Sequence, residues 1–539
     1  MQPLWLEKLS RWDEAKNSYL TRNNTYNEKY PKDRPPQHKM WMLNQLGTLR
    51  CLHALGEYSE LVKGAEILLN DLQSLEIHGK EDYYTWLNEI QKLGANAAWM
   101  LGSWENMEYF ARIDRFRVDS IDASLEQSGS FYETILAINQ RDYIKGSNTI
   151  NSIRESLADN MSTLLVENYS RANRAMISMQ VLAELEEVIE FKKFEDHAEH
   201  SRRDIYSAWA LIDDDDDRDN NDEDCNSAKT ILEVASIGVK RKHLLKTWQT
   251  RLRCVPCVAD IYRQILAVHT MVIDPKDDLE SWLKLASLCR EEGRMKLCQN
   301  ILLRLGGPRL VNGVEKCHIE FQGEERCDIS VFYNFIKYVW HYGERRLALE
   351  TMLKFVHEDL ELATATPSTE TGIVELKVKS LLKCAEWMRS LREYPLEEVK
   401  SIVNDAKCLK ENYYWVWHAW GATNYEWIQR NGENASMHSI ENNVRKNSYK
   451  KHAVYDILLR DKNGQIKHSS NMNSSSEANM INFVSGAIEG FINSIRLGKH
   501  QPIAYVLQDI LRLLTLWFNY GMKQRQKTGW FLFLHTNVD

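Results

Sequence analysis

Glycine and proline are both scarce in this 539-residue sequence, with 24 and 10 residues. Short strands need frequent turns of these residues, so their scarcity favours long helices joined by short turns. No apolar run approaches the ~20 residues of a membrane span, and the first residues mix charges with aromatics instead of forming a secretory signal. Hydrophobic residues nevertheless make up 43% of the chain, which excludes global disorder.

Motifs of nucleotide and phosphoryl chemistry are also missing. The sequence has no glycine-rich phosphate loop, no Walker lysine and no HRD or DFG motif. His418 stands among three tryptophans, but the spacing suggests no acid or nucleophile beside it, so we interpret it as a packed or surface histidine. We expect no catalytic residue, no metal site and no cofactor of its own on this chain.

The net charge of -8 has one local source, the segment Asp213–Asp224. Its nine acids and one arginine leave the remaining residues close to neutral, without the basic excess of a nucleic-acid-binding protein. The EF-hand pattern fails there because the central glycine and the closing glutamate are missing. We expect residues 212–228 to be an acidic disordered insertion.

The ten cysteines are scattered, and we expect reduced thiols in an intracellular protein. Cys254 and Cys257 form a lone CxxC, and redox chemistry at this pair is one functional alternative. Cys289 with Cys298, or Cys317-His318 with Cys327, offers further metal ligands, but their spacings fit no known zinc knuckle. We therefore interpret these residues as ordinary thiols.

Three short basic clusters accompany nearby acids: Arg202-Arg203, Lys240-Arg241-Lys242 and Arg345-Arg346. We interpret them as solvated helix faces or helix ends. The alternative is a polyanion site formed where several helices converge.

Apolar spacing predicts helices in most of the chain. Met179, Leu182, Leu185 and Ile189 form a stripe with Glu184, Glu187 and Glu190 between them, which predicts a helix with an acidic opposite face. A second helix is predicted from Asp277, with Trp282, Leu285 and Leu288 buried and Gly293 as its left-handed cap.

A turn signature of a small or polar residue, an aromatic and an acid recurs between these helical stripes. Its first aromatics are Trp12, Tyr58, Trp104 and Tyr143, spaced by 46, 46 and 39 residues. Related forms are Glu292-Gly293-Arg294, Tyr342-Gly343-Glu344 and Ala385-Glu386-Trp387. The period is typical of helical hairpins that stack because one pair cannot bury its apolar face alone. The sequence thus predicts an all-α fold, an α-solenoid of tetratricopeptide-like repeats.

Two strings point to a family: YSRA at residues 169–172 and LAELEEVIEFK at residues 182–192. They closely resemble the FAT region of the target-of-rapamycin (TOR) serine/threonine protein kinases. Collinear similarities follow at Leu49–Tyr58, Ala97–Glu108, Phe131–Ala137, Trp282–Cys289, Trp417–Trp420 and Leu513–Gly521.

The resemblance implies a scaffold and regulatory solenoid that clamps the kinase domain of a longer polypeptide. The implied partners are that kinase domain and TOR-complex subunits in nutrient and growth signalling, with no nucleic acid and no membrane span. The implied location is the cytoplasm, also peripheral to endomembranes or the lysosome. Family members hold an inositol polyphosphate in a basic pocket of this region, but its ligands do not carry over residue by residue.

The expected organisation is FAT repeats over 1–211 and 229–428, the insertion 212–228, a low-complexity loop over 429–479, further FAT helices over 480–521 and an off-family tail over 522–539. Kinase and HEAT-repeat segments of the family are missing, so we expect no enzyme on this chain and a truncated fragment. Two alternatives remain: a free-standing helical-repeat adaptor derived from such a kinase, and the FAT region of another member of the same kinase superfamily.

Overall fold

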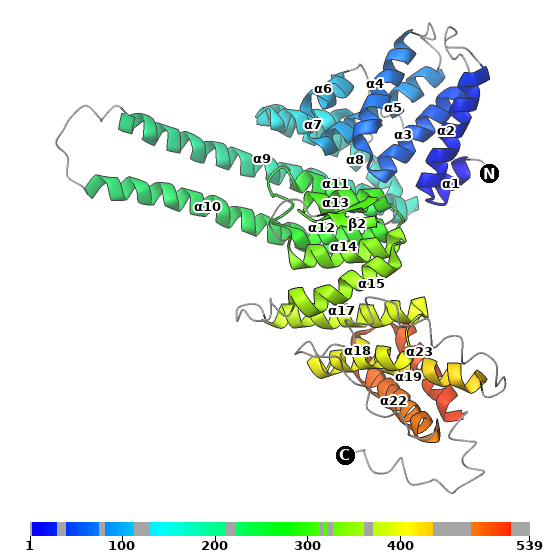
Figure 1. Cartoon of the computed structure of the whole chain (residues 1–539). Helices are drawn as coiled ribbons and strands as arrows, with labels where there is room; N and C mark the ends of the chain where they lie inside the picture. The colour runs from blue at the N-terminus through cyan, green and yellow to red at the C-terminus, as the bar shows by residue number, and fades with distance from the viewer. Residues whose placement is uncertain are drawn as a thin grey trace. The chain divides into compact units, whose positions relative to one another are not determined.

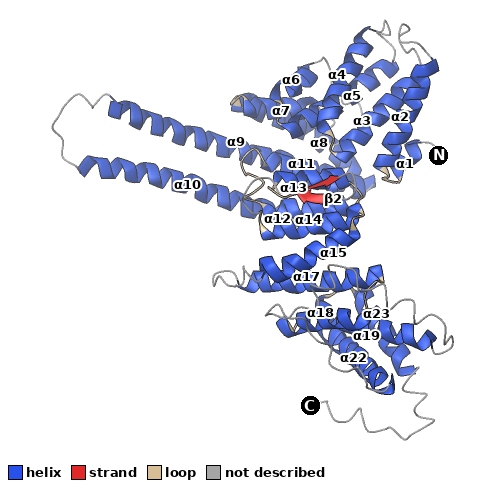
Figure 2. Cartoon of the chain, viewed as in Figure 1, coloured by secondary structure: helices blue, strands red, loops and turns tan. Residues whose placement is uncertain are grey.

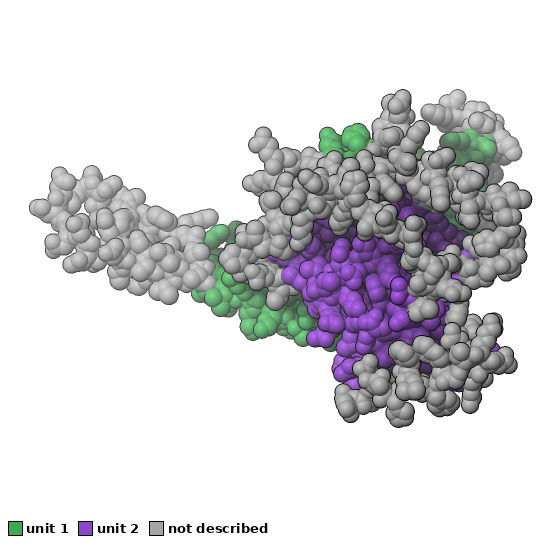
Figure 3. Space-filling view, turned by 60° about the horizontal axis from the view of Figure 1, so that its bottom comes forward, with its two compact units in different colours: residues 1–338 green, residues 339–539 purple. Residues whose placement is uncertain are grey.

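The computed structural model describes residues 3–29, 39–74, 81–112, 129–167, 169–210, 221–312, 317–320, 327–360, 370–434 and 476–518. Helices dominate these residues (Figure 2), so the predicted all-α fold is confirmed. One short antiparallel sheet, β1 (Arg309–Asn312) with β2 (Cys317–Glu320), was not expected from the sequence. The chain divides into two compact units, residues 1–338 and 339–539 (Figure 3), which are described separately.

The first unit begins with four consecutive helical hairpins (Figure 1). Each of the four signature aromatics is the first residue of a hairpin's second helix. The helices are α1 (Pro3–Lys8), α2 (Trp12–Lys29), α3 (Lys39–Leu55), α4 (Tyr58–Ser74), α5 (Glu81–Leu101), α6 (Trp104–Arg112), α7 (Gly129–Asn139) and α8 (Tyr143–Glu167).

One backbone conformation closes every one of these hairpins. Ser10, Gly56, Gly102 and Arg141 have positive φ angles of 58°, 77°, 71° and 64°. In the α3–α4 turn the N–H group of Glu57 donates to the carbonyl of Leu52 at 3.0 Å, and the other three turns have the same six-to-one bond. These are Schellman caps, which satisfy carbonyls at the end of the first helix. Glycine suits the position, and serine or arginine takes it at a cost of about 1–2 kcal/mol.

The rest of the first unit holds a long helix pair and a shorter stack. Helices α9 (Tyr169–Ala210) and α10 (Asn221–Leu252) run side by side away from the other helices of the unit (Figure 1). The stack consists of α11 (Ala259–His269), α12 (Leu279–Glu291), α13 (Met295–Arg304) and the first part of α14 (Ile329–Tyr342). Gly293 caps α12 with a φ of 77°, as predicted.

The stripe expected along residues 176–191 lies within α9. Leu182, Leu185 and Ile189 are buried, but the expected acidic face is wrong at Glu184, whose side chain is fully buried. A buried partner, His269, accounts for this carboxylate, and sequence spacing could not show it.

The acidic segment 212–228 lies only partly among the described residues. Residues 221–228 form the beginning of α10, and residues 212–220 lie outside the described part. The loop expected over 429–479 likewise contributes residues 429–434 to α19 (Tyr414–Asn434) and 476–479 to α22 (Ser476–Leu497), while its centre and the tail 522–539 lie outside.

The second unit continues the antiparallel helical pairs. Its further elements are α15 (Arg345–Lys354), η2 (Phe355–Asp359), α17 (Glu370–Leu391), α18 (Leu396–Leu409), η4 (Gly498–His500) and α23 (Ile503–Leu516). The turn expected at Ala385–Trp387 is wrong, because these residues lie inside α17. Trp387 is buried there and stacks on Trp340 at 4.5 Å between ring centroids. The chain turns later, where Arg392 adopts a φ of 55°.

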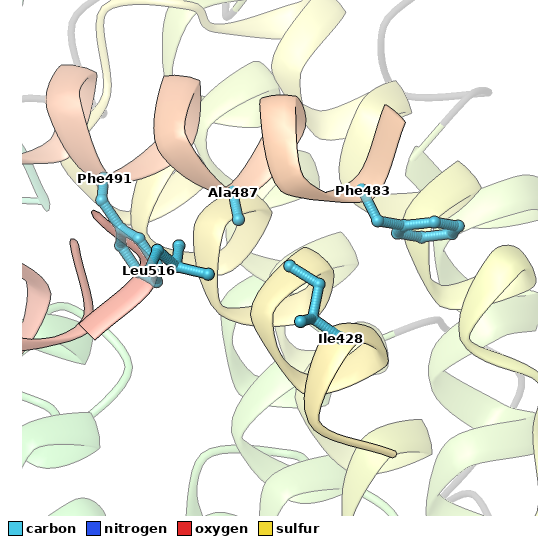
Figure 4. Close-up of a cluster of buried hydrophobic side chains, with 5 residues drawn as sticks. All are labelled: Ile428, Phe483, Ala487, Phe491 and Leu516. Carbon is cyan, nitrogen blue, oxygen red and sulfur yellow. The ribbon is translucent and has the colours of Figure 1, made fainter. Parts of the chain in front are cut away.

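Two glycines let α19 and α22 approach closely. A Cβ atom on Gly490 would lie 2.5 Å from the backbone nitrogen of Gly421. Around this contact Ile428, Phe483, Ala487, Phe491 and Leu516 form a buried cluster contributed by α19, α22 and α23 (Figure 4). The cluster fixes α23 against the pair that precedes it.

Candidate functional site

The CxxC cysteines lie in the turn between α10 and α11. Both Cys254 and Cys257 are free and exposed, and the element before them is a helix instead of the strand that a thioredoxin-like site requires. The interpretation as ordinary thiols stays a prediction.

The other nominated cysteines do not gather into a metal site. Cys289 and Cys298 are buried in the first unit, and burial raises the pKa of both thiols, that of Cys298 to about 12. The strand β2 holds Cys317 and an exposed His318, while Cys327 is half-buried. Across the described part of the chain, no three histidine, cysteine or acidic side chains lie close enough to share a metal ion.

Two of the basic clusters support packing between neighbouring helices. The Lys240 amine lies 3.6 Å from the ring centre of Phe194, and Arg241 contacts Glu195 at 3.4 Å, which joins α10 to α9. Arg346 forms an ion pair with Glu393 at 2.6 Å, in the second unit. Arg202 and Arg203 belong to α9, but their side chains lie outside the described ones.

His418 has the acidic partner that sequence spacing did not suggest. Its Nδ1 donates to both carboxylate oxygens of Asp509 on α23, at 2.8 and 2.9 Å. Tyr414 and Ser494 place hydroxyl groups 3.1 and 2.9 Å from the same carboxylate, which is fully buried. Burial and this carboxylate raise the pKa of the Tyr414 phenol. The cluster fastens α23 to α19 and α22; none of its contacts includes a nucleophile activated by the imidazole.

A buried arginine joins three parts of the first unit. The Nη1 atom of Arg263 on α11 lies 3.1 Å from His53, 3.2 Å from the Tyr58 hydroxyl and 3.1 Å from the Asn96 carbonyl oxygen. Burial and the adjacent Arg263 charge lower the pKa of His53 to about 3, so the ring is neutral at physiological pH. The residues are far apart in sequence, and only a repeat-by-repeat alignment of the hairpins could have brought them together.

A second buried polar contact joins the long helices α9 and α10 to the stack that begins with α11. His269 on α11 donates from Nε2 to Glu184 on α9 at 3.0 Å, and both side chains are nearly inaccessible. Trp248 of α10 stacks on the imidazole with ring centroids 4.4 Å apart. Three helices therefore meet at one polar contact, which fixes the base of α9 and α10.

The outer face of α23 is an exposed apolar surface of the second unit. Four side chains spaced by four, four and three residues share one side of the helix: Ile503, Leu507, Leu511 and Leu514. They are 52% to 76% exposed, and Trp517 and Phe518 extend the same face. The opposite side of α23 carries Asp509 and Leu516, both buried. A helix that buries one side and exposes aliphatic side chains on the other is typical of an element that packs on both, and contiguous exposed apolar residues mark interaction sites.

The helical hairpins stack on one another, and buried polar contacts join neighbouring helices. Together with the apolar outer face of α23, these features define a helical-repeat scaffold. The sequence profile of the FAT domain matches residues 91–211 and 225–515, so the chain belongs to the FAT domain family. The predicted resemblance to the FAT region of a TOR kinase is thereby confirmed, as is the scaffold character of this region.

Curated relatives of this chain include TOR kinases of several organisms. The chain is 28% identical to serine/threonine-protein kinase TOR2 of Saccharomyces cerevisiae, over 97% of the chain and 18% of the relative. It is 26% identical to serine/threonine-protein kinase TOR of Arabidopsis thaliana, over 99% of the chain and 18% of the relative. It is also 26% identical to serine/threonine-protein kinase mTor of Drosophila melanogaster, over 97% of the chain and 17% of the relative. The chain thus spans less than a fifth of the length of these relatives.

One solved structure, the crystal structure of APC/C hetero-tetramer Cut9-Hcn1, covers 97% of this chain and 94% of its own at 10% identity. Its TM-score is 0.20. Among the helices that the structure describes, none is both long and apolar enough to cross a membrane.

Proposed function

We propose that this chain is the scaffold portion of a TOR-type serine/threonine protein kinase that acts in nutrient and growth signalling. The main support for this proposal is the exposed apolar face of α23, in combination with the FAT family match. That face lies at the end of the matched region, and its four aliphatic side chains are more than half exposed. A stacked repeat array buries such faces between successive hairpins, so a further helical element is the fitting cover.

The catalytic activity would belong to the longer polypeptide, and this region would contribute packing surfaces to its kinase domain and to subunits of TOR complexes. The expected location is the cytoplasm, in part at endomembranes or the lysosome. An inositol polyphosphate remains the proposed ligand of a basic pocket in this region; calorimetric titration of the chain with inositol hexakisphosphate tests it.

The experiment is an affinity purification of the endogenous protein through a tag placed at residue 1 of this chain. We expect a polypeptide roughly five times longer than 539 residues, given the 18% share of the relatives, with kinase activity on a generic peptide substrate. A 63.1 kDa product without an associated kinase would contradict the proposal and favour the free-standing adaptor.

An inhibitor control separates bound contaminants from intrinsic activity. An ATP-competitive TOR inhibitor added to the kinase assay of the purified sample should abolish the activity, while the long polypeptide is still present. Activity that survives the inhibitor would assign the parent to another kinase class.

A further inference from the structure

The first unit contains an open pocket that none of the functions above uses. Its volume is about 660 Å³, and its walls come from the α3–α4 turn, the end of α5, and α11 to β1. Four side chains form an apolar lining that is largely buried: Trp282, Leu285, Leu297 and Ile301. Leu101, 48% exposed, continues it toward the solvent.

The pocket is held in shape by contacts between its walls. Asn300 on α13 donates from Nδ2 to the carbonyl of Gly56 at 3.0 Å, and Lys296 forms an ion pair with Glu57 of the same turn. A Cβ atom on Gly56 would lie 2.8 Å from Leu297, so the turn sits directly against α13. Pre-formed pockets of this kind lose little ordering entropy when a ligand binds.

Two arginines of the lining have no ion pair among the described residues, and the Asp274 carboxylate acts on Arg304 only from beyond ion-pair distance. Arg304 ends α13 and Arg309 begins β1; across the described part of the chain neither has an ion pair within 4.0 Å. The Arg304 guanidinium lies 5.2 Å from the ring centre of Trp282, and the surrounding protein lowers its pKa by desolvation. In contrast, Glu57 in the same pocket is engaged by both Lys16 and Lys296.

We propose that this pocket binds an acidic peptide segment of a partner protein, with a carboxylate on Arg304 and Arg309 and an adjacent apolar side chain over Trp282 and Leu101. Guanidinium groups recognise carboxylates through paired, charge-assisted hydrogen bonds. The apolar lining disfavours a polyphosphate, which needs cationic groups on every side. Extended acidic motifs suit concave repeat surfaces with arginine clusters.

The test uses the full 539-residue chain and three fluorescein-labelled dodecapeptides that alternate acids with phenylalanine or leucine in different registers. Fluorescence anisotropy should show saturable binding of at least one peptide, weakened by added salt. The double variant R304A/R309A should weaken that binding tenfold or more, and L101D should weaken it as well. The matched control is R253A, because Arg253 is equally charged, 67% exposed and outside the pocket.

Four outcomes would overturn the proposal. These are no binding of any of the three peptides, equal weakening by R253A, equal binding of peptides with glutamine and asparagine in place of the acids, and displacement by equimolar inositol hexakisphosphate. Circular dichroism of each variant confirms that helical content is unchanged. None of these measurements depends on a kinase domain, so the pocket and the kinase assignment can fail separately.

Discussion

At the scale of single residues, polar side chains buried between helices are the most consequential feature of this chain. His53, His269 and Asp509 each lie where at least three elements meet, and each has a hydrogen-bond partner distant in sequence. A junction of this kind adds little stability over an apolar one, but removal of one partner leaves the others buried without hydrogen bonds. Substitutions there should therefore be costly.

The first prediction concerns Asp509. D509A should lower the free energy of unfolding of the second unit by about 3–5 kcal/mol, because His418, Tyr414 and Ser494 would lose their common acceptor. Urea denaturation followed by tryptophan fluorescence measures the change. E489Q is the matched control, since Glu489 is exposed and its pair with Lys407 contributes at most about 1 kcal/mol. If D509A and E489Q lowered the free energy of unfolding equally, the buried contacts of Asp509 would not be important for stability.

A second prediction concerns pH and His53. The pKa of this ring is about 3 in the folded chain and about 6.5 when unfolded, so the unfolded state binds more protons between these values. Stability should fall as the pH drops below 6.5, by up to about 1.4 kcal/mol per pH unit from this group. His53→Gln should reduce that slope in thermal unfolding between pH 6.5 and 5. A slope identical to that of the wild type would contradict the assignment.

Glu398 gives a third prediction, with the opposite sign. Burial, reinforced by the neighbouring Glu397, raises its pKa to about 7. Between pH 4.5 and 7 the folded state binds the extra proton, so this group costs stability as the pH rises through that range. E398Q should raise the free energy of unfolding by about 1–3 kcal/mol at pH 8 and have little effect at pH 4. Chemical denaturation at the two pH values measures it; a loss of stability at pH 8 would count against it.

At the scale of helices and turns, close backbone approach decides which pairs form. The α19–α22 contact depends on Gly421 and Gly490, whereas Gly372 at the start of α17 faces open space. The prediction is a matched pair of substitutions. Gly490→Ala should destabilise the second unit by several kcal/mol because its methyl group would meet backbone, and Gly372→Ala should stabilise by about 0.5–1 kcal/mol through helix propensity. Thermal unfolding compares them, and the same sign for both would be inconsistent with this packing.

The helical elements were largely predictable from the sequence, and the reasons are local. The turn aromatics at 12, 58, 104 and 143 marked helix starts correctly, because the cap geometry and the aromatic repeat together in each hairpin. Ala385–Trp387 imitated the signature without a residue suited to positive φ, and it proved to be helical core. The junctions at Arg263 and Asp509 were beyond prediction, since Arg263 contacts His53 210 positions away and Asp509 contacts His418 91 positions away.

At the scale of the whole molecule, the exposed face of α23 determines whether the chain self-associates in solution. Burying its leucines and aromatics against any apolar partner would be favourable by about 25 cal/mol per Å². We expect the isolated chain to self-associate at micromolar concentration, and the pair L507K and L511E to shift it toward monomer. Light scattering after size-exclusion chromatography measures the mass. The exposed pair K499E and H500Q, on η4, is the control; a monomeric wild type would rule the prediction out.

The packing of α19 on α22 has a further implication for how the chain could be taken apart. These two helices form one interdigitated pair although 41 positions, 435–475, separate them along the chain. Three non-covalent contacts join the residues before position 435 to those after position 475. They are the glycine contact, the aromatic stack of Trp427 on Phe483 and the Asp509 cluster. If a protease cleaved the chain between positions 435 and 475, the two fragments of the second unit would therefore remain associated and keep the native fold.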